Sequence, residues 1–142
     1  MIWGKVYLSK GAAMHHILII DDSEFDRRMI TLAMQSTGLN LDFTELSNGS
    51  DVLDTMSKLE PTVTFLDIRM PGKSGFEILS EIKSAKNLNN CPVVLVSGSD
   101  AQCDRTKASE MGASGYFKKP HTRQDYKDIA NNIKQQFMRE AA

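Results

Sequence analysis

Four of the short apolar segments in this sequence end on residues that can carry charge or form hydrogen bonds. These residues are, in chain order, Asp21 and Asp22, then Asp67, then Ser97, and finally Lys118 and Lys119. Any one of them alone could be a helix cap, a turn residue or a solvated charge. Their common position after an apolar segment favours one shared site.

Such a site would have an unbalanced charge. Three carboxylates and one ammonium group sum to a net charge of −2. Carboxylates about 4 Å apart repel by roughly 4 kcal/mol at an effective dielectric near 20, and a divalent cation would remove that repulsion. Mg²⁺ suits the site because it binds through one or two carboxylates and shares its coordination with phosphate. A carboxylate beside Mg²⁺, with hydroxyl and ammonium donors nearby, can accept a phosphoryl group as an aspartyl phosphate.

The apolar segments are predicted strands, and amphipathic stretches separate them. The strands are expected at residues 17–20, 41–46, 62–66, 92–96 and 114–117. Alternating strands and helices predict an α/β fold, with a single doubly wound five-stranded parallel sheet and helices on both faces. Ligands in such folds bind outside the carboxyl ends of the strands, where the polar residues lie.

The helices are predicted from the spacing of their apolar residues. The first is expected to end at Gly38 and to bury the stripe formed by Phe25, Met29, Leu32, Ala33 and Ser36. The later helices are indicated by apolar positions within residues 52–59, 78–82, 101–111 and 126–137.

Composition limits the classes of protein. The chain has 142 residues, 41% hydrophobic and 25% charged, as in an ordinary globular domain. A formal net charge of −1 argues against a surface that grips nucleic acid. No run approaches the roughly 20 apolar residues of a membrane helix. Cys91 and Cys103 have no metal-finger or C-x-x-C spacing, which favours a reduced, cytoplasmic setting.

Residues 1–13 do not fit the pattern of the rest. Lys5 and Lys10 interrupt the apolar core that a signal peptide needs. Because Met14 resembles a natural start, residues 1–13 are expected to be a leader or cloning remnant and residues 14–142 the domain. A stand-alone domain is favoured over one cut from a longer chain, because few residues follow the last predicted helix.

Four motifs closely resemble those of the receiver domain of two-component response regulators, of the stand-alone type related to chemotaxis regulators. They are IDDS at 20–23, FLDIRMPGKSG at 65–75, VLVSGS at 94–99 and GASGYFKKP at 112–120. The resemblance extends from Met14 to about Met138. It implies a flavodoxin-like sheet with strand order 2-1-3-4-5.

The resemblance also implies a role for each matching residue around a Mg²⁺ ion. Asp67 matches the phosphoacceptor. Asp22 matches a direct metal ligand and Asp21 a ligand that acts through water. Arg69 matches the position whose backbone carbonyl completes the protein's share of the metal shell.

Three further matches concern the response to phosphorylation. Ser97 matches the hydroxyl residue that binds the phosphoryl group. Lys119 matches the family's lysine, whose peptide bond to the following Pro120 is typically cis. Tyr116 matches the aromatic residue whose ring turns inward from an exposed position during the switch.

The function implied is a phosphorylation switch and not an enzyme. A sensor histidine kinase or a histidine phosphotransfer protein would donate the phosphoryl group. The face formed by the fourth helix, fifth strand and fifth helix would then control a downstream effector protein, without contacts to nucleic acid or membrane. The oligomeric state stays open, with a phosphorylation-linked dimer as one alternative.

Three other functions fit the residues less well. A hydrolase of the haloacid dehalogenase type needs a second Asp two residues after its nucleophile, where this sequence has Arg69. The glycine-rich motifs of nucleotide-binding folds are absent from the sequence. A pure interaction module would need a disrupted acidic pocket, and here the set of acidic residues is complete.

Overall fold

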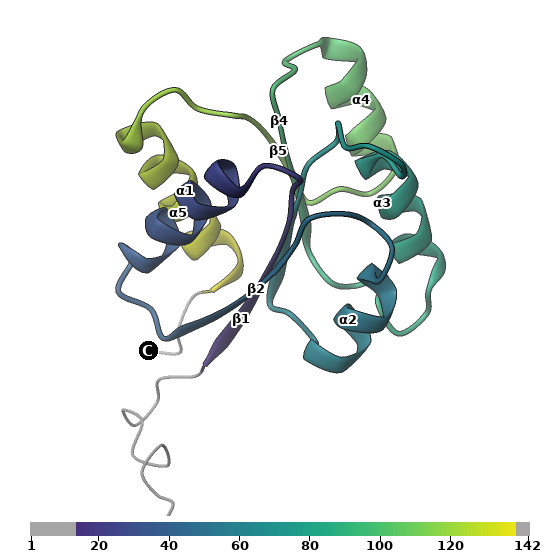
Figure 1. The fold of residues 1–142 in the computed structure, drawn as a ribbon, viewed down its shortest axis with the longest axis horizontal. Coiled ribbons are helices and arrows are strands. Elements are labelled where there is room, and N and C mark those ends of the chain that lie inside the picture. The colour runs from purple at the N-terminus through teal and green to yellow at the C-terminus, as the bar shows by residue number, and fades with distance from the viewer. Residues whose placement is uncertain (1–13, 139–142) are drawn as a thin grey trace, which may run out of the picture.

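The computed structural model describes residues 14–138, so the expected leader at residues 1–13 lies outside the described residues. Strands and helices alternate without exception along this range (Figure 1). In chain order they are β1 (His15–Ile20), α1 (Glu24–Gln35), β2 (Leu41–Leu46), α2 (Val52–Leu59), β3 (Val63–Leu66), α3 (Gly75–Ser84), β4 (Val93–Ser97), α4 (Gln102–Glu110), β5 (Gly115–Lys118) and α5 (Arg123–Phe137).

The five strands form one parallel sheet in the order β2-β1-β3-β4-β5. This confirms the predicted fold class and strand order. Ile20 at the end of β1 pairs with Leu46 in β2 and with Leu66 in β3, so these three strands end at the same level. Helices α1 and α5 cover one face of the sheet, and α2, α3 and α4 cover the other (Figure 1).

Alternate residues of the central strands supply a hydrophobic core on each face. Ile17 and Phe65 belong to the core under α1 and α5, whereas Leu18 and Leu66 belong to the core under α2, α3 and α4. Strands β3 and β4 are buried along their whole length, as expected for parallel strands covered on both faces. This burial holds the strands in place and with them the residues that follow each strand.

The predicted buried stripe of α1 is wrong at three positions, because Ser36, which caps the helix, is exposed as well as Phe25 and Leu32. Phe25 is 69% exposed and Leu32 is 42% exposed, whereas the helix buries Ile30, Ala33 and Met34. Apolar residues occupy two adjacent stripes of α1, and their spacing alone does not say which stripe faces the sheet. Packing against the sheet and α5 selects the stripe that contains Ile30 and Met34.

Backbone hydrogen bonds continue the sheet beyond the ends of its strands. The N–H of Asp21 donates to the last carbonyl of β2 at 3.0 Å, and the N–H of Asp67 donates to the last carbonyl of β1 at 2.9 Å. The N–H of Lys119 donates to the last carbonyl of β4 at 2.7 Å. The backbone of each of these three residues is therefore fixed at the carboxyl edge by a hydrogen bond that continues the ladder of the sheet.

Helix α3 begins at a glycine that has no room for a side chain. A Cβ atom on Gly75 would lie 2.7 Å from the Cα of Ile68 and would also meet the backbone of Asp67. The N–H of Gly75 donates to the carbonyl of Ile68 at 2.8 Å. The start of α3 thus packs directly against the loop that follows β3.

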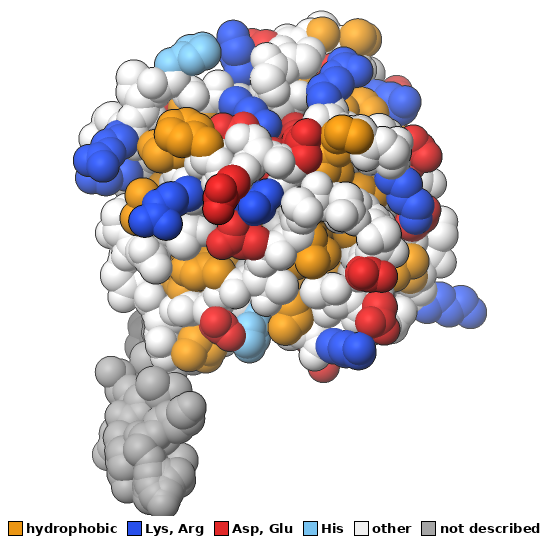
Figure 2. Space-filling view, viewed as in Figure 1, with side chains coloured by type: hydrophobic (Ala, Val, Ile, Leu, Met, Phe, Trp, Pro, Cys, Tyr) orange, Lys and Arg blue, Asp and Glu red, His pale blue; other side chains and the backbone are white. Residues whose placement is uncertain are grey.

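The surface carries both signs of charge. Basic and acidic side chains are interspersed over the face shown in Figure 2, in keeping with the net charge of −1. Within residues 14–138, no helix is long and apolar enough to cross a membrane.

Candidate functional site

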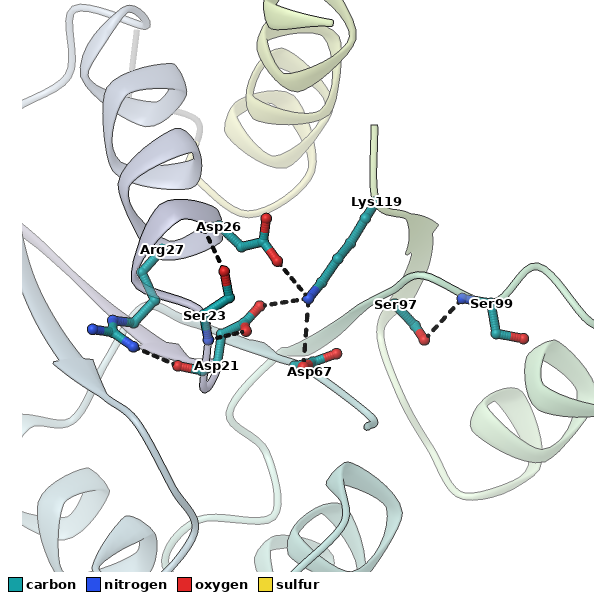
Figure 3. A network of polar contacts seen from close by, with 8 residues as sticks. All are labelled: Asp21, Ser23, Asp26, Arg27, Asp67, Ser97, Ser99 and Lys119. Carbon is teal, nitrogen blue, oxygen red and sulfur yellow. Dashed lines mark hydrogen bonds and ion pairs between the residues drawn. The ribbon is translucent and has the colours of Figure 1, made fainter. Parts of the chain in front are cut away.

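Asp21, Asp67 and Lys119 meet at the carboxyl edge of the sheet (Figure 3). The Lys119 Nζ lies 3.0 Å from Oδ2 of Asp21 and 3.4 Å from Oδ2 of Asp67. The two aspartates are only 2% and 3% exposed. Two buried acids therefore share one ammonium group, which comes from the loop after β5.

A third carboxylate reaches the same ammonium group from helix α1. Oδ2 of Asp26 lies 2.8 Å from the Lys119 Nζ, the shortest of the three contacts. Burial by itself lowers the pKa of Lys119, but hydrogen bonds from its nitrogen to Asp26 and Asp21, with the charges of Asp21 and Asp67, raise it well above its usual range. Lys119 therefore stays positively charged at any physiological pH.

The loop between β1 and α1 is fixed by hydrogen bonds to Asp21. The backbone N–H of Ser23 donates to Oδ1 of Asp21 at 2.9 Å, and Arg27 Nη1 donates to the Asp21 carbonyl oxygen at 2.7 Å. Arg27 also pairs with Glu45 at 2.9 Å. These contacts hold the Asp21 carboxylate toward Lys119 and Asp67.

The site passes a simple test for a hard divalent cation. One carboxylate oxygen from each of Asp21, Asp22 and Asp67 lies within 4.8 Å of the others. Asp22 is exposed and the other two are buried, so the cluster is open to solvent on one side. Three converging carboxylate oxygens with an open side could hold a hard divalent cation that keeps part of its water shell.

Burial and crowding of negative charge change how the acids titrate. Burial raises the pKa of Asp67 to about 6, and the charge of Asp21 adds to this increase, while Lys119 and a backbone hydrogen bond from Arg69 oppose it. Burial likewise raises the pKa of Asp21. Asp67 is therefore a buried carboxylate, crowded by negative charge and next to an ammonium group, which is a setting in which a carboxylate can act as a nucleophile.

Ser97 lies on the side of Asp67 away from α1 (Figure 3) and is fully buried. Its Oγ accepts a hydrogen bond from the backbone N–H of Ser99 at 3.2 Å. The carbonyl of Ser99 in turn accepts a hydrogen bond from the Tyr116 hydroxyl at 2.7 Å. A short chain of contacts therefore joins Ser97 to Tyr116.

The expected exposed ring of Tyr116 is not what the structure shows. Tyr116 is half-buried, because its hydroxyl is tied to Ser99 and the guanidinium group of Arg105 stacks 4.8 Å from its ring centroid. The expected cis peptide before Pro120 is also wrong, because no peptide bond within residues 14–138 is cis. The trans form is the lower in energy for most bonds that precede proline.

Arg69 joins the site to α4. Its side chain donates from Nη2 to Oδ2 of Asp104 at 2.9 Å, while its backbone lies two residues beyond Asp67. Asp104 is 8% exposed and is one of only two buried residues of α4. The loop that follows the central acid is therefore linked by an ion pair to the helix beyond Ser97.

The comparison with protein families agrees with this geometry. The family model described as "Response regulator receiver domain" matches residues 17–131. The chain belongs to this family. Receiver domains of two-component systems are signalling switches, and this receiver domain carries the acidic pocket expected of one.

Several curated proteins resemble the receiver domain over most of its length. The two-component response regulator ORR11 of Oryza sativa subsp. indica is 30% identical over 112 residues, which are 78% of this chain and 74% of the relative. Protein PilG of Pseudomonas aeruginosa is 28% identical over 109 residues, 77% of this chain and 79% of PilG. The uncharacterized transcriptional regulatory protein YkoG of Bacillus subtilis is 31% identical over 105 residues. The matched part is 74% of this chain but only 44% of YkoG.

Solved structures share the fold of the receiver domain. The phosphorylated cyanobacterial phytochrome response regulator RcpA superposes with a TM-score of 0.80 at 23% identity, covering 92% of this chain and 98% of RcpA. The chemotaxis protein CheY4 of Vibrio cholerae gives 0.72 at 21% identity, covering 85% and 99%.

The structure brings together most of the site residues expected from the sequence, and it adds two. Asp21, Asp22 and Asp67 form one cluster and Lys119 contacts two of them, whereas the side chain of Lys118 is exposed at the end of β5. The two residues not foreseen are both acidic and both on helices, Asp26 on α1 and Asp104 on α4. Acidic residues are common in the first turn of a helix because they stabilise the helix. The residue type and position of Asp26 and Asp104 therefore did not distinguish them from ordinary helix residues.

Proposed function

We propose that this receiver domain accepts a phosphoryl group on Asp67 and uses it to change a protein-binding surface. The observation that carries the proposal is the Asp67 carboxylate, 3% exposed, between two other acids and 3.4 Å from the Lys119 ammonium group. The donor would be a sensor histidine kinase or a histidine phosphotransfer protein. One carboxylate oxygen of Asp67 attacks the phosphorus, and the bond from phosphorus to the histidine nitrogen breaks with its electron pair left on the imidazole.

Mg²⁺ is the proposed cofactor of this transfer. Asp22 and Asp67 would bind it directly, Asp21 through water, and Arg69 through its backbone carbonyl. When bound, it supplies positive charge that offsets the repulsion between carboxylates and phosphoryl oxygens. Lys119, 3.4 Å from Asp67, would add a second positive charge, so that the protein positions and neutralises the reacting groups.

The proposed output is a rearrangement around Ser97. A phosphoryl group on Asp67 brings new acceptor oxygens, and the Ser97 hydroxyl is a donor on that side of the pocket. Movement of Ser97 would strain its contact with Ser99 and thereby alter the Tyr116 hydrogen bond. The face of α4, β5 and α5 would change with it and favour a downstream effector protein.

The proposed setting is the cytoplasm, where Cys91 and Cys103 would remain the free thiols seen here. The chain is proposed to act as a switch whose only chemistry is its own phosphorylation and loss of the phosphoryl group. A phosphorylation-linked dimer is one arrangement of the active form that size-exclusion chromatography would reveal.

The test is phosphorylation by a small donor, because the cognate kinase is not needed for it. Acetyl phosphate with Mg²⁺ should add one phosphoryl group, measured by intact mass, and Asp67→Asn should add none. Asp54→Asn is the matched control, since it removes an exposed acid on α2 that pairs with Lys58 at 3.1 Å. Modification of Asp67→Asn at the wild-type level would overturn the assignment.

A further inference from the structure

Lys119 is contacted by an acid that the proposed chemistry does not use. Asp26 makes the shortest contact with the Lys119 Nζ, 2.8 Å, compared with 3.0 Å for Asp21 and 3.4 Å for Asp67. Asp26 is absent from the cluster of carboxylates that could hold a metal. Among the described residues, the only polar contact of the Asp26 side chain is the one with Lys119.

Local structure explains why the Asp26 carboxylate is available for this contact. Asp26 is the third residue of α1 after the cap Ser23, and its backbone N–H donates to the Ser23 Oγ at 3.2 Å. An acid at this position commonly accepts a hydrogen bond from the backbone N–H of the cap residue. Here Asp21 Oδ1 already accepts that hydrogen bond at 2.9 Å, so the Asp26 side chain is left to bind Lys119.

The position of Asp26 determines the direction of its effect. Asp26 approaches the Lys119 ammonium group from α1, whereas Ser97 lies on the opposite side of Asp67 (Figure 3). An ammonium group has three N–H donors, and three carboxylates surround it. A phosphoryl oxygen on Asp67 could gain a hydrogen bond from Lys119 only by displacing or sharing one of these contacts.

We propose that Asp26 is a positioning residue that competes with the phosphoryl group for Lys119 and so lowers the population of the activated form. The inference rests on the proposed function, because it concerns the lysine of the same site. The ion pair with Asp26 keeps the Lys119 ammonium group directed toward α1. This ion pair must weaken when Lys119 donates a hydrogen bond to the phosphoryl group. The negative charge of Asp26 thus favours the resting state.

The central experiment removes the charge of Asp26 and keeps its shape. Asp26→Asn should bind beryllofluoride, a stable mimic of the phosphoryl group, about fivefold more tightly than wild type in Mg²⁺, as measured by ¹⁹F NMR titration. A fivefold change corresponds to about 1 kcal/mol, the net value of a typical hydrogen bond. Asp26→Glu keeps the charge and should stay near wild type. Asp54→Asn, which also removes an acid paired with a lysine, should bind as wild type does.

A double variant shows whether Asp26 acts through Lys119. In a Lys119→Met background, adding Asp26→Asn should leave beryllofluoride affinity unchanged, because the lysine that Asp26 holds is gone. A fivefold gain that persists without Lys119 would mean that Asp26 acts by its charge alone, and this would overturn the competition. Equal affinities for wild type and Asp26→Asn would overturn it too.

Failure of this inference can be told apart from failure of the proposed function. If wild type itself neither binds beryllofluoride nor accepts a phosphoryl group from acetyl phosphate, the proposed function fails. In that case the resting contact is still tested by the ¹⁵N signal of the Lys119 ammonium group, which should shift in Asp26→Asn and not in Asp54→Asn. If wild type responds and Asp26→Asn responds identically, the competition alone is wrong.

Discussion

The charge on Asp67 destabilises the metal-free fold at neutral pH. Its pKa is about 6 in the folded protein against an ordinary value of 3.8. At a pH between these two pKa values, Asp67 binds more protons in the folded state than in the unfolded state. The free energy of unfolding therefore falls as the pH rises from about 4 to about 6, and it keeps this lower value at higher pH. A variant with an uncharged residue in place of Asp67 should not show this fall in the free energy of unfolding.

Asp67→Asn should therefore stabilise the protein at pH 7 by on the order of 1–2 kcal/mol in EDTA. The gain is smaller than the whole pKa difference implies, because Lys119 loses one partner. At pH 4 the difference from wild type should vanish, since Asp67 is then largely protonated. Urea unfolding at both pH values measures this, and a larger gain at pH 4 than at pH 7 would contradict the sign.

Ser97 should separate phosphorylation from its structural consequence. Ser97→Ala should still accept a phosphoryl group on Asp67, but it loses the hydroxyl that contacts the Ser99 N–H at 3.2 Å. Beryllofluoride should then produce less than half of the wild-type change in the amide chemical shifts around Tyr116 and α4. Ser99→Ala is the matched control, because its backbone N–H and carbonyl, which make the contacts with Ser97 and Tyr116, remain. A full wild-type shift pattern in Ser97→Ala would rule out this coupling.

Residue types and their positions after the strands were enough to predict that Asp21 and Asp67 meet a lysine from the end of the fifth strand. The choice of Lys119 over Lys118 came from the family resemblance, and the contacts of Lys119 agree with it. The contact of Asp26 with Lys119 could not be predicted in the same way, because it depends on Asp21 taking the hydrogen bond that an acid at this helix position usually makes. The path of the loop between β1 and α1 determines which carboxylate accepts this hydrogen bond, and the sequence contains no pattern that predicts it.

At the scale of elements, the buried strands were the most predictable features. A continuous apolar run such as residues 92–96 has apolar side chains on both faces of the strand, so in a parallel sheet it must be buried on both faces. Helix α1 was less predictable, because its apolar residues form two stripes and only one can face the sheet. Phe25 and Leu32 lie on the stripe that packing left exposed.

The junction of α3 with the loop after β3 should tolerate no side chain at Gly75. Gly75→Ala places a methyl group 2.7 Å from the Ile68 Cα, so α3 or the loop must move, and we expect a loss of about 1–3 kcal/mol in stability. The loop carries Asp67, so acetyl phosphate should also phosphorylate this variant more slowly. Gly98→Ala is the control, because its Cβ would meet nothing within 4 Å. Wild-type stability of Gly75→Ala in urea unfolding would show that the junction can relax.

At the scale of the whole molecule, Mg²⁺ should stabilise the fold. A ligand that binds only the folded state at ten times its dissociation constant raises the free energy of unfolding by about 1.4 kcal/mol. Thermal unfolding should therefore shift upward with Mg²⁺ and return with EDTA. Asp22→Ala should lose the shift, because it removes the exposed carboxylate of the cluster, whereas Asp42→Asn, which neutralises an exposed acid on β2, should keep it. An unchanged shift in Asp22→Ala would mean that the metal binds elsewhere.

The sheet as a whole shows where sequence reasoning stops. Alternating strands and helices are enough to predict a parallel sheet covered on both faces. The order β2-β1-β3-β4-β5 came from resemblance to a known family, because apolar periodicity carries no information on which strands are neighbours. The position of the site at the carboxyl edge follows once both are known.

Helix α4 stands out as the element that should open most easily. It buries only Asp104 and Ala108, and one of these depends on the ion pair with Arg69, so local unfolding of α4 exposes little apolar surface. Its amide protons should therefore exchange with deuterated solvent well before those of α3, which buries Phe76, Ile78, Leu79 and Ile82. A change in the strength of the ion pair between Arg69 and Asp104 should therefore change the exchange rates of the α4 amide protons and leave the core unchanged. Because Arg69 lies in the loop after Asp67, these exchange rates would report on that loop.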